Sequence, residues 1–276
     1  MPTNPSILIT GCSSGIGYAC AKLLKARGYF VIASARNPTD VERLRQEGFT
    51  AIMLDLADSA SIKAAVAETL SLTGGTLNAL FNNGAFGQPG AVEDLSRDVL
   101  RFQFETNVFG THELTNLVLP IMRKQGYGRI IYNSSVLGFV AMTYRGAYNA
   151  SKFALEGLVD TLRLELHGVN IQVCLIEPGP ITSAFRSNAF ALYQRNINPE
   201  HSFHKETYQA IEARLQKEGS VAPFTLPAEA VAEKLIHALE AKHPKIRYYV
   251  TFPTYLMAIL KRLLPMSWMD KVLRKI

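Results

Sequence analysis

Six short apolar runs without polar alternation recur along this chain, separated by longer segments with helical periodicity. A strand that is apolar on both faces suits the interior of a parallel sheet. Strand, helix and strand repeated in this way predict an α/β fold, a doubly wound parallel sheet with helices on both faces. The expected strands are 7–9, 30–33, 51–54, 79–81, 129–132, 171–176 and, as a seventh, 247–252. The expected helices are 16–27, 59–72, 97–124, 146–167, 204–218 and 227–242, the last with Pro227 at its first position.

The length of 276 residues fits one large domain over 1–276, because neither a repeat nor a low-complexity linker interrupts the pattern. In a doubly wound sheet, ligands bind at the carboxyl ends of the strands. The segment 183–226 follows the sixth strand, so we expect it to overhang that site as a substrate lid. Residues 253–276 are expected to form a C-terminal helical extension.

Composition narrows the classes of function. The chain is 48% hydrophobic and 19% charged, which is typical of a globular protein. Its three cysteines form no CxxC pair, which argues against a disulfide framework or a zinc site and suits the cytoplasm. Residues 1–6 lack the basic and apolar parts of a signal peptide, and no apolar run reaches the roughly 18 residues of a membrane span.

The net charge of +6 is unevenly placed. The segment 254–276 carries five basic side chains and one acid, so +4 of the charge lies in this tail and +2 elsewhere. The body therefore lacks the basic face that nucleic-acid binding needs. The sequence of this tail predicts two short basic amphipathic helices. Such helices can make peripheral contact with an anionic membrane, pack on the body, or contact a second subunit, and the sequence leaves the three open.

A glycine-rich turn directly follows the first expected strand. Gly11, Gly15 and Gly17 stand in the segment 10–17, Thr-Gly-Cys-Ser-Ser-Gly-Ile-Gly, which opens the next helix. Glycine lets the backbone approach a phosphate closely, and the helix amino terminus offers free N–H groups and a positive dipole end. This context predicts a site for a dinucleotide pyrophosphate.

A phenol and an ammonium lie one helical turn apart in the segment 148–152, Tyr-Asn-Ala-Ser-Lys. Lys152 at i+4 shares a helical face with Tyr148. The ordinary pKa of a tyrosine is about 10, and a nearby ammonium is expected to lower it. Tyr148 is therefore the expected general acid of a carbonyl reduction. Tyr144, one turn earlier, has no lysine at i+4 and is expected to line the pocket or lie at the surface.

Together these motifs resemble the short-chain dehydrogenase/reductase family, over about residues 5–250. The glycine-rich stretch, Arg36 and the stretch 174–181, Cys-Leu-Ile-Glu-Pro-Gly-Pro-Ile, are most similar to the branch of 17-beta-hydroxysteroid and retinol dehydrogenases and related bacterial reductases. The resemblance implies a Rossmann fold of about seven strands, a nicotinamide cofactor, and hydride transfer between a carbonyl and an alcohol.

The resemblance also implies the residues of the cofactor site. Asp55 is similar to the family's adenine-binding acid, and Asn82-Asn83-Gly84-Ala85 resembles its Asn-Asn-Ala-Gly stretch with the last two residues exchanged. The segment 178–183 resembles the loop that holds the nicotinamide carboxamide, with Ser183 where the family usually has threonine. The cofactor-binding residues expected on this basis are Gly11, Ser13, Ser14, Gly15, Ile16, Gly17, Arg36, Asp55, Leu56, Asn83, Gly84, Tyr148, Lys152, Pro178, Gly179, Ile181 and Ser183.

Four catalytic residues follow from the same resemblance: Asn107, Ser135, Tyr148 and Lys152. Ser135 precedes Tyr148 by 13 residues and would bond the substrate carbonyl. Lys152 would also bond the nicotinamide ribose. Asn107 resembles the asparagine whose carbonyl holds a water that links the lysine to solvent.

The end of the second strand decides between NAD and NADP. It reads Ala33-Ser34-Ala35-Arg36-Asn37, without the acid that would accept bonds from a ribose 2′-hydroxyl. The guanidinium of Arg36 matches a 2′-phosphate, and the hydroxyl of Ser14 could add to the same contact. The sequence therefore predicts NADP(H) as the cofactor.

We expect an oxidoreductase that acts on an apolar aldehyde or ketone, or on the corresponding alcohol; the direction stays open. The aromatic side chains of the lid could bind such a substrate or pack the lid to the body, and they are Phe185, Phe190, Tyr193 and Phe203. The alternatives are a non-catalytic NADP(H)-binding sensor or scaffold and a lipid-surface adaptor. Family members often form homodimers through two long helices, here 97–124 and 146–167.

No metal site is predicted. His112 and His167 fall on expected helices without a second His, Cys or acid at metal-ligand spacing.

Overall fold

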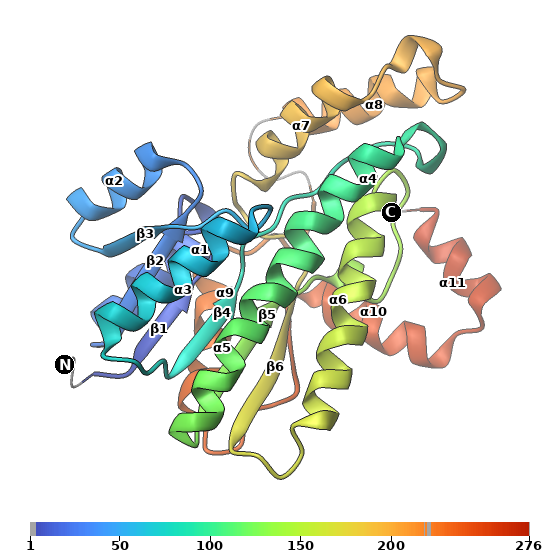
Figure 1. The fold of residues 1–276 in the computed structure, drawn as a ribbon. Helices are drawn as coiled ribbons and strands as arrows, with labels where there is room; N and C mark the ends of the chain where they lie inside the picture. The colour runs from blue at the N-terminus through green and yellow to red at the C-terminus, as the bar shows by residue number, and fades with distance from the viewer. Residues whose placement is uncertain (1–3, 218, 220–221, 276) are drawn as a thin grey trace.

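A seven-stranded sheet, parallel throughout, organises the computed structural model, which describes residues 4–217, 219 and 222–275 (Figure 1). The strands lie in the order β3-β2-β1-β4-β5-β6-β7, so the order reverses between β1 and β4. This confirms the doubly wound α/β fold. The strands are β1 (Ser6–Ile9), β2 (Phe30–Ala35), β3 (Thr50–Met53), β4 (Ala79–Asn82), β5 (Gly128–Asn133), β6 (Ile171–Pro178) and β7 (Arg247–Val250).

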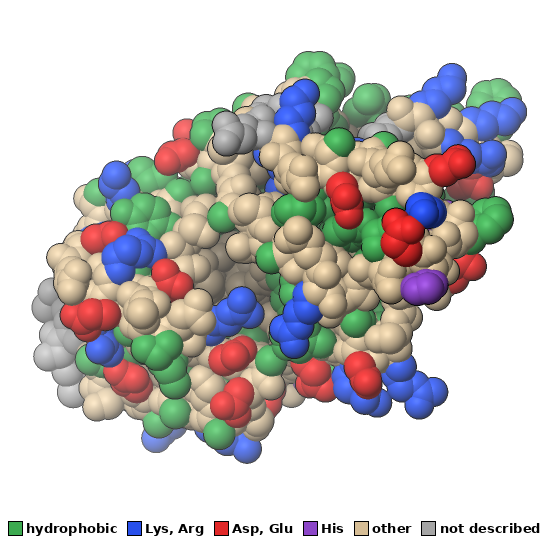
Figure 2. Space-filling view, turned by 90° about the horizontal axis from the view of Figure 1, so that it is seen from above, with side chains coloured by type: hydrophobic (Ala, Val, Ile, Leu, Met, Phe, Trp, Pro, Cys, Tyr) green, Lys and Arg blue, Asp and Glu red, His purple; other side chains and the backbone are tan. Residues whose placement is uncertain are grey.

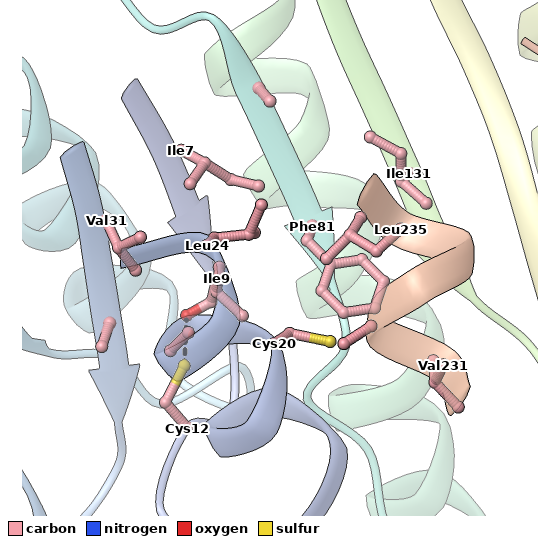
Figure 3. Packing of buried hydrophobic residues seen from close by; sticks show 14 of the residues in the cluster. Ile7, Ile9, Cys12, Cys20, Leu24, Val31, Phe81, Ile131, Val231 and Leu235 are labelled. Carbon is pink, nitrogen blue, oxygen red and sulfur yellow. Dashed lines mark hydrogen bonds between the residues drawn. The ribbon is translucent and has the colours of Figure 1, made fainter. Parts of the chain in front are cut away.

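Helices cover both faces of the sheet. One face carries α1 (Gly15–Ala26), α2 (Pro38–Gln46) and α9 (Glu229–Glu240), and the other carries α3 (Ser59–Thr73), α5 (Thr111–Gln125) and α6 (Gly146–Glu165). Figure 3 shows the first face, where side chains of α1 and α9 pack on the central strands; the labelled residues are Ile7, Ile9, Cys12, Cys20, Leu24, Val31, Phe81, Ile131, Val231 and Leu235.

The two-sided burial explains the unbroken apolar runs. Ile7 and Ile9 point to the α1 and α9 side, whereas Leu8 between them packs on the α3, α5 and α6 side. All three side chains are fully buried. Because successive side chains of a strand alternate between faces, a strand covered on both sides needs apolar residues at every position.

Several predicted boundaries were wrong. A helix, α2, lies between β2 and β3 where none was predicted, and its signal was Pro38 at the first helical position after Asn37. The seventh strand ends at Val250 rather than at 252, because Thr251 has a positive φ of 79°. Pro227 lies two residues before α9 and not at its first position.

The predicted helix 97–124 consists of three pieces. These are α4 (Arg97–Phe104), the π-helical η2 (Glu105–Gly110) and α5. At the end of η2 the chain passes the carbonyl of Leu56, and a Cβ on Gly110 would lie 1.7 Å from that oxygen. Apolar periodicity over a long segment does not reveal one wide turn, so the sequence predicted a single helix.

Two helices, α7 (Phe185–Asn196) and α8 (Lys205–Gln216), form the segment expected to be a lid (Figure 1). Tyr193 and Tyr208 are fully buried between them, and Phe190 stacks on Tyr193 with ring centroids 6.5 Å apart. Tyr144, expected in a pocket wall or at the surface, is instead hydrogen-bonded to His204 at 3.1 Å and joins the lid to the body. Residues 218, 220 and 221 of the predicted lid lie outside the described residues. The short helices of the chain are η1 (Val92–Asp94), η3 (Val136–Gly138) and η4 (Pro199–His201).

The tail consists of two helices, as predicted: α10 (Phe252–Leu263) and α11 (Met266–Leu273). Met257 and Met269 are buried against Val140 in the loop that joins β5 to α6. One side of the tail therefore packs on the body, which was one of the three alternatives. Ile276 lies outside the described residues, and none of the described helices is long and apolar enough to span the hydrocarbon core of a membrane.

Three carboxylates surround one guanidinium beneath β6. Arg247 at the start of β7 forms ion pairs with Glu156 at 2.7 Å, Asp160 at 2.9 Å and Glu177 at 2.8 Å. Asp160 also pairs with Arg163 at 3.3 Å, so two guanidinium groups face three carboxylates and the charges of this largely buried cluster do not balance. Burial and the neighbouring Glu156 raise the pKa of Glu177 to about 8, and burial also raises the pKa of Glu156.

We predict that Glu177 makes the stability of the protein depend on pH. Its folded pKa lies above its unfolded pKa, so its stabilising contribution is present below about pH 4.5 and is lost as the pH rises through about 8. Glu177→Gln is expected to flatten this decline in the free energy of unfolding, measured by urea denaturation between about pH 5 and about pH 8. The exposed Glu165→Gln is the control. Parallel pH curves for the wild type and Glu177→Gln would contradict the assignment.

Candidate active site

A cleft of about 1480 Å³ opens at the carboxyl ends of the strands. Figure 2 views the molecule from that side and shows a hollow near the middle of the face. Residues that end β2, β5 and β6 line its floor, among them Arg36, Ser134 and Pro178. Residues of α7, α8, α10 and the end of α11 line its outer wall.

The cleft brings together nearly all of the predicted site residues. Gly17 and Asn107 do not line it, and both lie just behind its wall. The predicted residues that do line it are Gly11, Ser13, Ser14, Gly15, Ile16, Arg36, Asp55, Leu56, Asn83, Gly84, Ser135, Tyr148, Lys152, Pro178, Gly179, Ile181 and Ser183.

The glycine-rich turn is held against the end of β4. Asn83 donates from Nδ2 to the carbonyl oxygens of Thr10 at 2.8 Å and Gly11 at 3.2 Å. The hydroxyl of Thr10 in turn accepts hydrogen bonds from the backbone N–H of Asn83 at 2.9 Å and of Gly84 at 2.7 Å. The exchanged residues of the stretch 82–85 thus keep a close fit to the turn.

The amino terminus of α1 faces the cleft. Ser14 caps the helix in an extended conformation, and its side chain makes no capping hydrogen bond to the described backbone. The first turn contains no acidic residue. Free backbone N–H groups and a positive dipole end without a nearby carboxylate suit an anion such as a pyrophosphate.

A Cβ has no room at Gly17. It would lie 2.2 Å from the carbonyl oxygen of Gly11 and 2.6 Å from Nδ2 of Asn83. The helix can therefore approach the turn, and the phosphate site in front of it, only with glycine at this position.

Arg36 and Asp55, the residues predicted to select the cofactor and to hold the adenine, both line the cleft. Arg36 follows β2 directly and is exposed, and Ser13 and Ser14 line the same cleft. Asp55 accepts a hydrogen bond on Oδ1 from the backbone N–H of Ala57 at 2.9 Å, which holds the carboxylate at the edge of the cleft. The pair offers a cation for a phosphate and an acceptor for an adenine amine.

The segment 178–183 closes the other end of the cofactor region. A Cβ built on Gly15 would lie 3.0 Å from Cβ of Ser183, so this segment meets the glycine-rich turn. The hydroxyl of Ser183 accepts a hydrogen bond from the backbone N–H of Phe185 at 3.4 Å. Thr182 lines the cleft beside it.

The catalytic candidates lie at the inner end of the cleft. Tyr148 and Lys152 are both buried on α6, and the Lys152 ammonium is 5.7 Å from the centroid of the Tyr148 ring. Lys152 donates to the carbonyl oxygen of Asn133 at 2.7 Å. Ser135, also buried, hydrogen-bonds to the Tyr148 phenol.

Burial, rather than the lysine, dominates the ionisation of this pair. It raises the pKa of Tyr148 to about 12, against the Ser135 hydrogen bond and the charge of Arg145, which lower it. The prediction that Lys152 brings the pKa of Tyr148 below its ordinary value is thus wrong, because burial outweighs the groups that lower it. Burial also lowers the pKa of Lys152 to about 8, against the charge of Glu156. For each group, the free energy lost when its charged form leaves water exceeds the free energy gained from the neighbouring groups.

Asn107 lies in the π-helical η2 and not in a regular helix. Its Nδ2 donates to the carbonyl of Phe86 at 2.9 Å and to the hydroxyl of Ser151 at 3.1 Å, and its Oδ1 accepts from the N–H of Phe86 at 3.2 Å. Ser151 is the residue before Lys152, so the side chain of Asn107 ties η2 to the turn of α6 that carries Tyr148 and Lys152.

One contributor to the cleft, Arg145, was not predicted from the sequence. Arg145 lines the cleft three residues before Tyr148, and its charge favours the ionised phenol. The sequence feature that could have identified it is a basic residue at the N-cap of α6. Phe185 lies edge-on to Tyr148 with ring centroids 5.2 Å apart, whereas Tyr193 packs within the lid and Phe203 is exposed. The lid aromatics thus divide between the cleft, the lid core and the surface.

Among the residues that the structure describes, no group of three His, Cys, Asp or Glu side chains could hold a metal ion. His112 is hydrogen-bonded to Asn116 at 2.9 Å on the surface of α5.

We predict that Gly17→Ala destabilises the turn. The added Cβ must push back the backbone of Gly11, and overpacking of this kind costs about 1–3 kcal/mol of the free energy of unfolding. Gly157→Ala is the matched control, because a Cβ there meets nothing within 4 Å and alanine favours a helix. Thermal and urea unfolding would measure both. Equal stability of the two variants would contradict the close approach at Gly17.

Comparison with known proteins agrees with this geometry. A family model described as short chain dehydrogenase matches residues 5–193. The uncharacterized oxidoreductase YbbO of Escherichia coli is 44% identical over 269 residues, which are 98% of this chain and 94% of that protein. The NADPH-dependent 3-dehydrocapnine reductase of Ornithobacterium rhinotracheale is 32% identical over 97% of this chain and 95% of its own length. The human 17-beta-hydroxysteroid dehydrogenase type 1 is 32% identical over 89% of this chain and 77% of its own length. The match over more than half of the chain, with a doubly wound sheet that carries the glycine-rich turn and the Tyr148–Lys152 pair, makes this protein a member of the short-chain dehydrogenase family of oxidoreductases.

Proposed function

We propose that this protein is an NADP(H)-dependent oxidoreductase that interconverts a carbonyl and an alcohol on an apolar small molecule, with Tyr148 as general acid and base. The observation that carries the proposal is that Tyr148, Lys152 and Ser135 line the same cleft as the glycine-rich turn. The cleft therefore offers a dinucleotide site and a proton donor in one continuous space.

The residues present fit a dinucleotide. The close approach at Gly17 and the uncapped amino terminus of α1 suit a pyrophosphate. Asp55 would hold the adenine, and the segment 178–183 would hold the carboxamide of the nicotinamide. Bound NADP(H) supplies or accepts the hydride.

Tyr148 acts on the substrate oxygen. Because burial keeps the pKa of Tyr148 near 12, the phenol is protonated at neutral pH and can donate its proton to a developing alkoxide. Ser135 hydrogen-bonds the same oxygen and orients it. In the reverse direction the phenolate accepts the proton, and the charge of Arg145 favours that form.

Lys152 and Asn107 carry a proton from solvent back to Tyr148 after it has donated its own. Lys152 is anchored by the Asn133 carbonyl, which leaves its other N–H groups for the ribose and for a water. The side chain of Asn107 is engaged with Phe86 and Ser151, so the role in a water relay falls to its backbone carbonyl in the widened turn of η2.

An apolar substrate is supported by the wall of the cleft on the side of Tyr148. Phe185 from α7 lies against Tyr148, and Leu192 from α7 and Met257 from α10 also line the cleft. Two similar proteins are named for reactions at a ketone or hydroxyl, the 3-dehydrocapnine reductase and the 17-beta-hydroxysteroid dehydrogenase. Both support a carbonyl as the reacting group.

NADP(H) rather than NAD(H) is supported by Arg36. The residue stands at the end of β2, where an acid would select the 2′-hydroxyl, and Ser14 lines the cleft near it. The 3-dehydrocapnine reductase, which is similar over nearly the whole chain, is NADPH-dependent by name.

Tyr148→Phe is expected to lower the turnover rate by about 100- to 10,000-fold while NADPH binding is kept, because only the proton donor is removed. The assay follows NADPH absorbance against medium-chain aldehydes, aromatic ketones, retinal and ketosteroids. Tyr144→Phe removes a hydroxyl one turn earlier, which bonds His204, and should leave turnover near the wild-type rate. Full activity of Tyr148→Phe would reject the mechanism. NADPH binding without turnover of any substrate would favour the sensor.

Arg36→Ala is expected to raise the Kd for NADPH by about 10- to 100-fold, since a hydrogen bond to a charged group contributes about 1.5–3 kcal/mol. The Kd for NADH should change little, because that cofactor has no 2′-phosphate. Fluorescence titration with both cofactors measures the difference. Arg97→Ala, at an exposed cation outside the cleft, is the matched control. An equal loss for NADPH and NADH would contradict the assignment of Arg36.

A further inference from the structure

The outward face of α10 carries an apolar stripe, defined here as the outer stripe: Phe252, Leu256, Ile259 and Leu263. These residues recur at i, i+4, i+7 and i+11, which places them on one side of the helix. Phe252 is 57% exposed, Ile259 54% and Leu263 72%. A surface helix of a globular protein normally turns polar residues outward, so the outer stripe calls for a contact that covers it.

The outer stripe is not the face that packs on the body. Thr254, Met257 and Ala258 are buried, and they lie on the opposite side of α10. The helix is therefore apolar on two sides, and the body accounts for only one of them. A helix apolar all round is expected where both sides meet an apolar medium.

Apolar exposure continues beyond the outer stripe. Met266 is 74% exposed and Trp268 59% exposed in α11, and Phe224, itself exposed, packs on Phe252 with ring centroids 5.0 Å apart. Figure 1 shows α10 and α11 together at the edge of the molecule beside α6, away from the centre of the sheet.

Positive charge surrounds this surface. All five basic residues of the tail are exposed, against one acid, and none of them forms a salt bridge within the described part of the chain. They are Lys261, Arg262, Lys271, Arg274 and Lys275. Lys261 lies over the Phe153 ring at 5.2 Å, and Lys275 also lines the cleft. Exposed cations without a salt bridge, on the same two helices as exposed apolar and tryptophan side chains, match the headgroups and acyl boundary of an anionic lipid surface.

We propose that the outer stripe and the five tail cations form a docking surface for a membrane of anionic phospholipids. A second copy of the chain fits less well, since two such surfaces would bring like charges together. The docked protein lies on the surface, because no described helix is long and apolar enough to cross.

Docking of this kind places the cleft beside the lipid. Pro253 and Met257 of α10 and Leu273 at the end of α11 line the cleft from the inner side of the same two helices. An apolar substrate dissolved in the membrane would then have a short path to Tyr148. The docking surface itself does not depend on the reaction, so its test is independent of activity.

The first test uses the full chain and its single tryptophan, Trp268, without any substitution. Vesicles of phosphatidylcholine with added phosphatidylglycerol are expected to shift the Trp268 emission to the blue and to carry the protein into the pellet. Neutral phosphatidylcholine vesicles, or high salt, should weaken both signals. Failure to bind the anionic vesicles would overturn the proposal.

Two sets of variants then locate the contact. The double variant Ile259→Asp and Leu263→Asp is expected to lower the bound fraction by more than about 10-fold, because charges replace apolar side chains at the lipid boundary. Lys271→Glu with Arg274→Glu should do the same through charge alone. Leu164→Asp, at a 65% exposed leucine on α6, should bind as the wild type does. Retained thermal stability and NADPH binding show that each variant is folded.

Two results would reject the outer stripe as a lipid contact. One is unchanged vesicle binding by both double variants. The other is a wild-type dimer in analytical ultracentrifugation that Ile259→Asp and Leu263→Asp dissociate, since the outer stripe would then be an interface between copies of the chain.

Discussion

A chain of hydrogen bonds from Lys152 to the glycine-rich turn holds the two halves of the site in one geometry. Lys152 donates to the carbonyl of Asn133 at 2.7 Å, and Nδ2 of Asn133 donates to Oδ1 of Asn83 at 2.9 Å. Asn83 then donates to the carbonyls of Thr10 and Gly11. The chain runs across the ends of β5, β4 and β1, at the point where the strand order reverses. The bond of Lys152 is buried and the others are partly buried, so all of them are at least partly shielded from water.

Burial is the main cause of the shifted pKa values on both sides of this hydrogen-bond network. In the cleft it keeps the Tyr148 phenol protonated and makes the Lys152 ammonium easier to discharge, which suits a site that donates a proton and receives it back. Beneath β6 it makes Glu177 hold a proton beside Arg247. The two regions meet at Glu156, whose charge opposes the effect of burial on Lys152. The ionisation of the Arg247 cluster and that of Lys152 are thus linked through one carboxylate.

The sequence predicted the sheet correctly, and most of the predicted site residues line one cleft, because both predictions rest on local patterns. An apolar run reports burial on two faces, and the spacing of Tyr148 and Lys152 reports one helical turn. The errors concern features that distant contacts create. The wide turn of η2 forms where Gly110 passes Leu56, and the raised pKa of Tyr148 comes from walls contributed by several segments, including Phe185 of the lid. Neither neighbour can be read from the residues next to it in the chain.

The sequence by itself determined the fold class, the glycine-rich turn, Arg36 in place of an acid, and the Tyr148–Lys152 pair, since each follows from residue type at short spacing. The tertiary structure alone decided which side of the tail packs on the body and which stays exposed. The periodicity of residues 252–263 is apolar on two sides, and only the contact of Met257 with Val140 shows which of them is inward. The tertiary structure also decided that Arg145 lines the cleft and that Tyr144 forms a hydrogen bond to His204 of the lid. The partner of a side chain depends on segments that fold against it from elsewhere in the sequence.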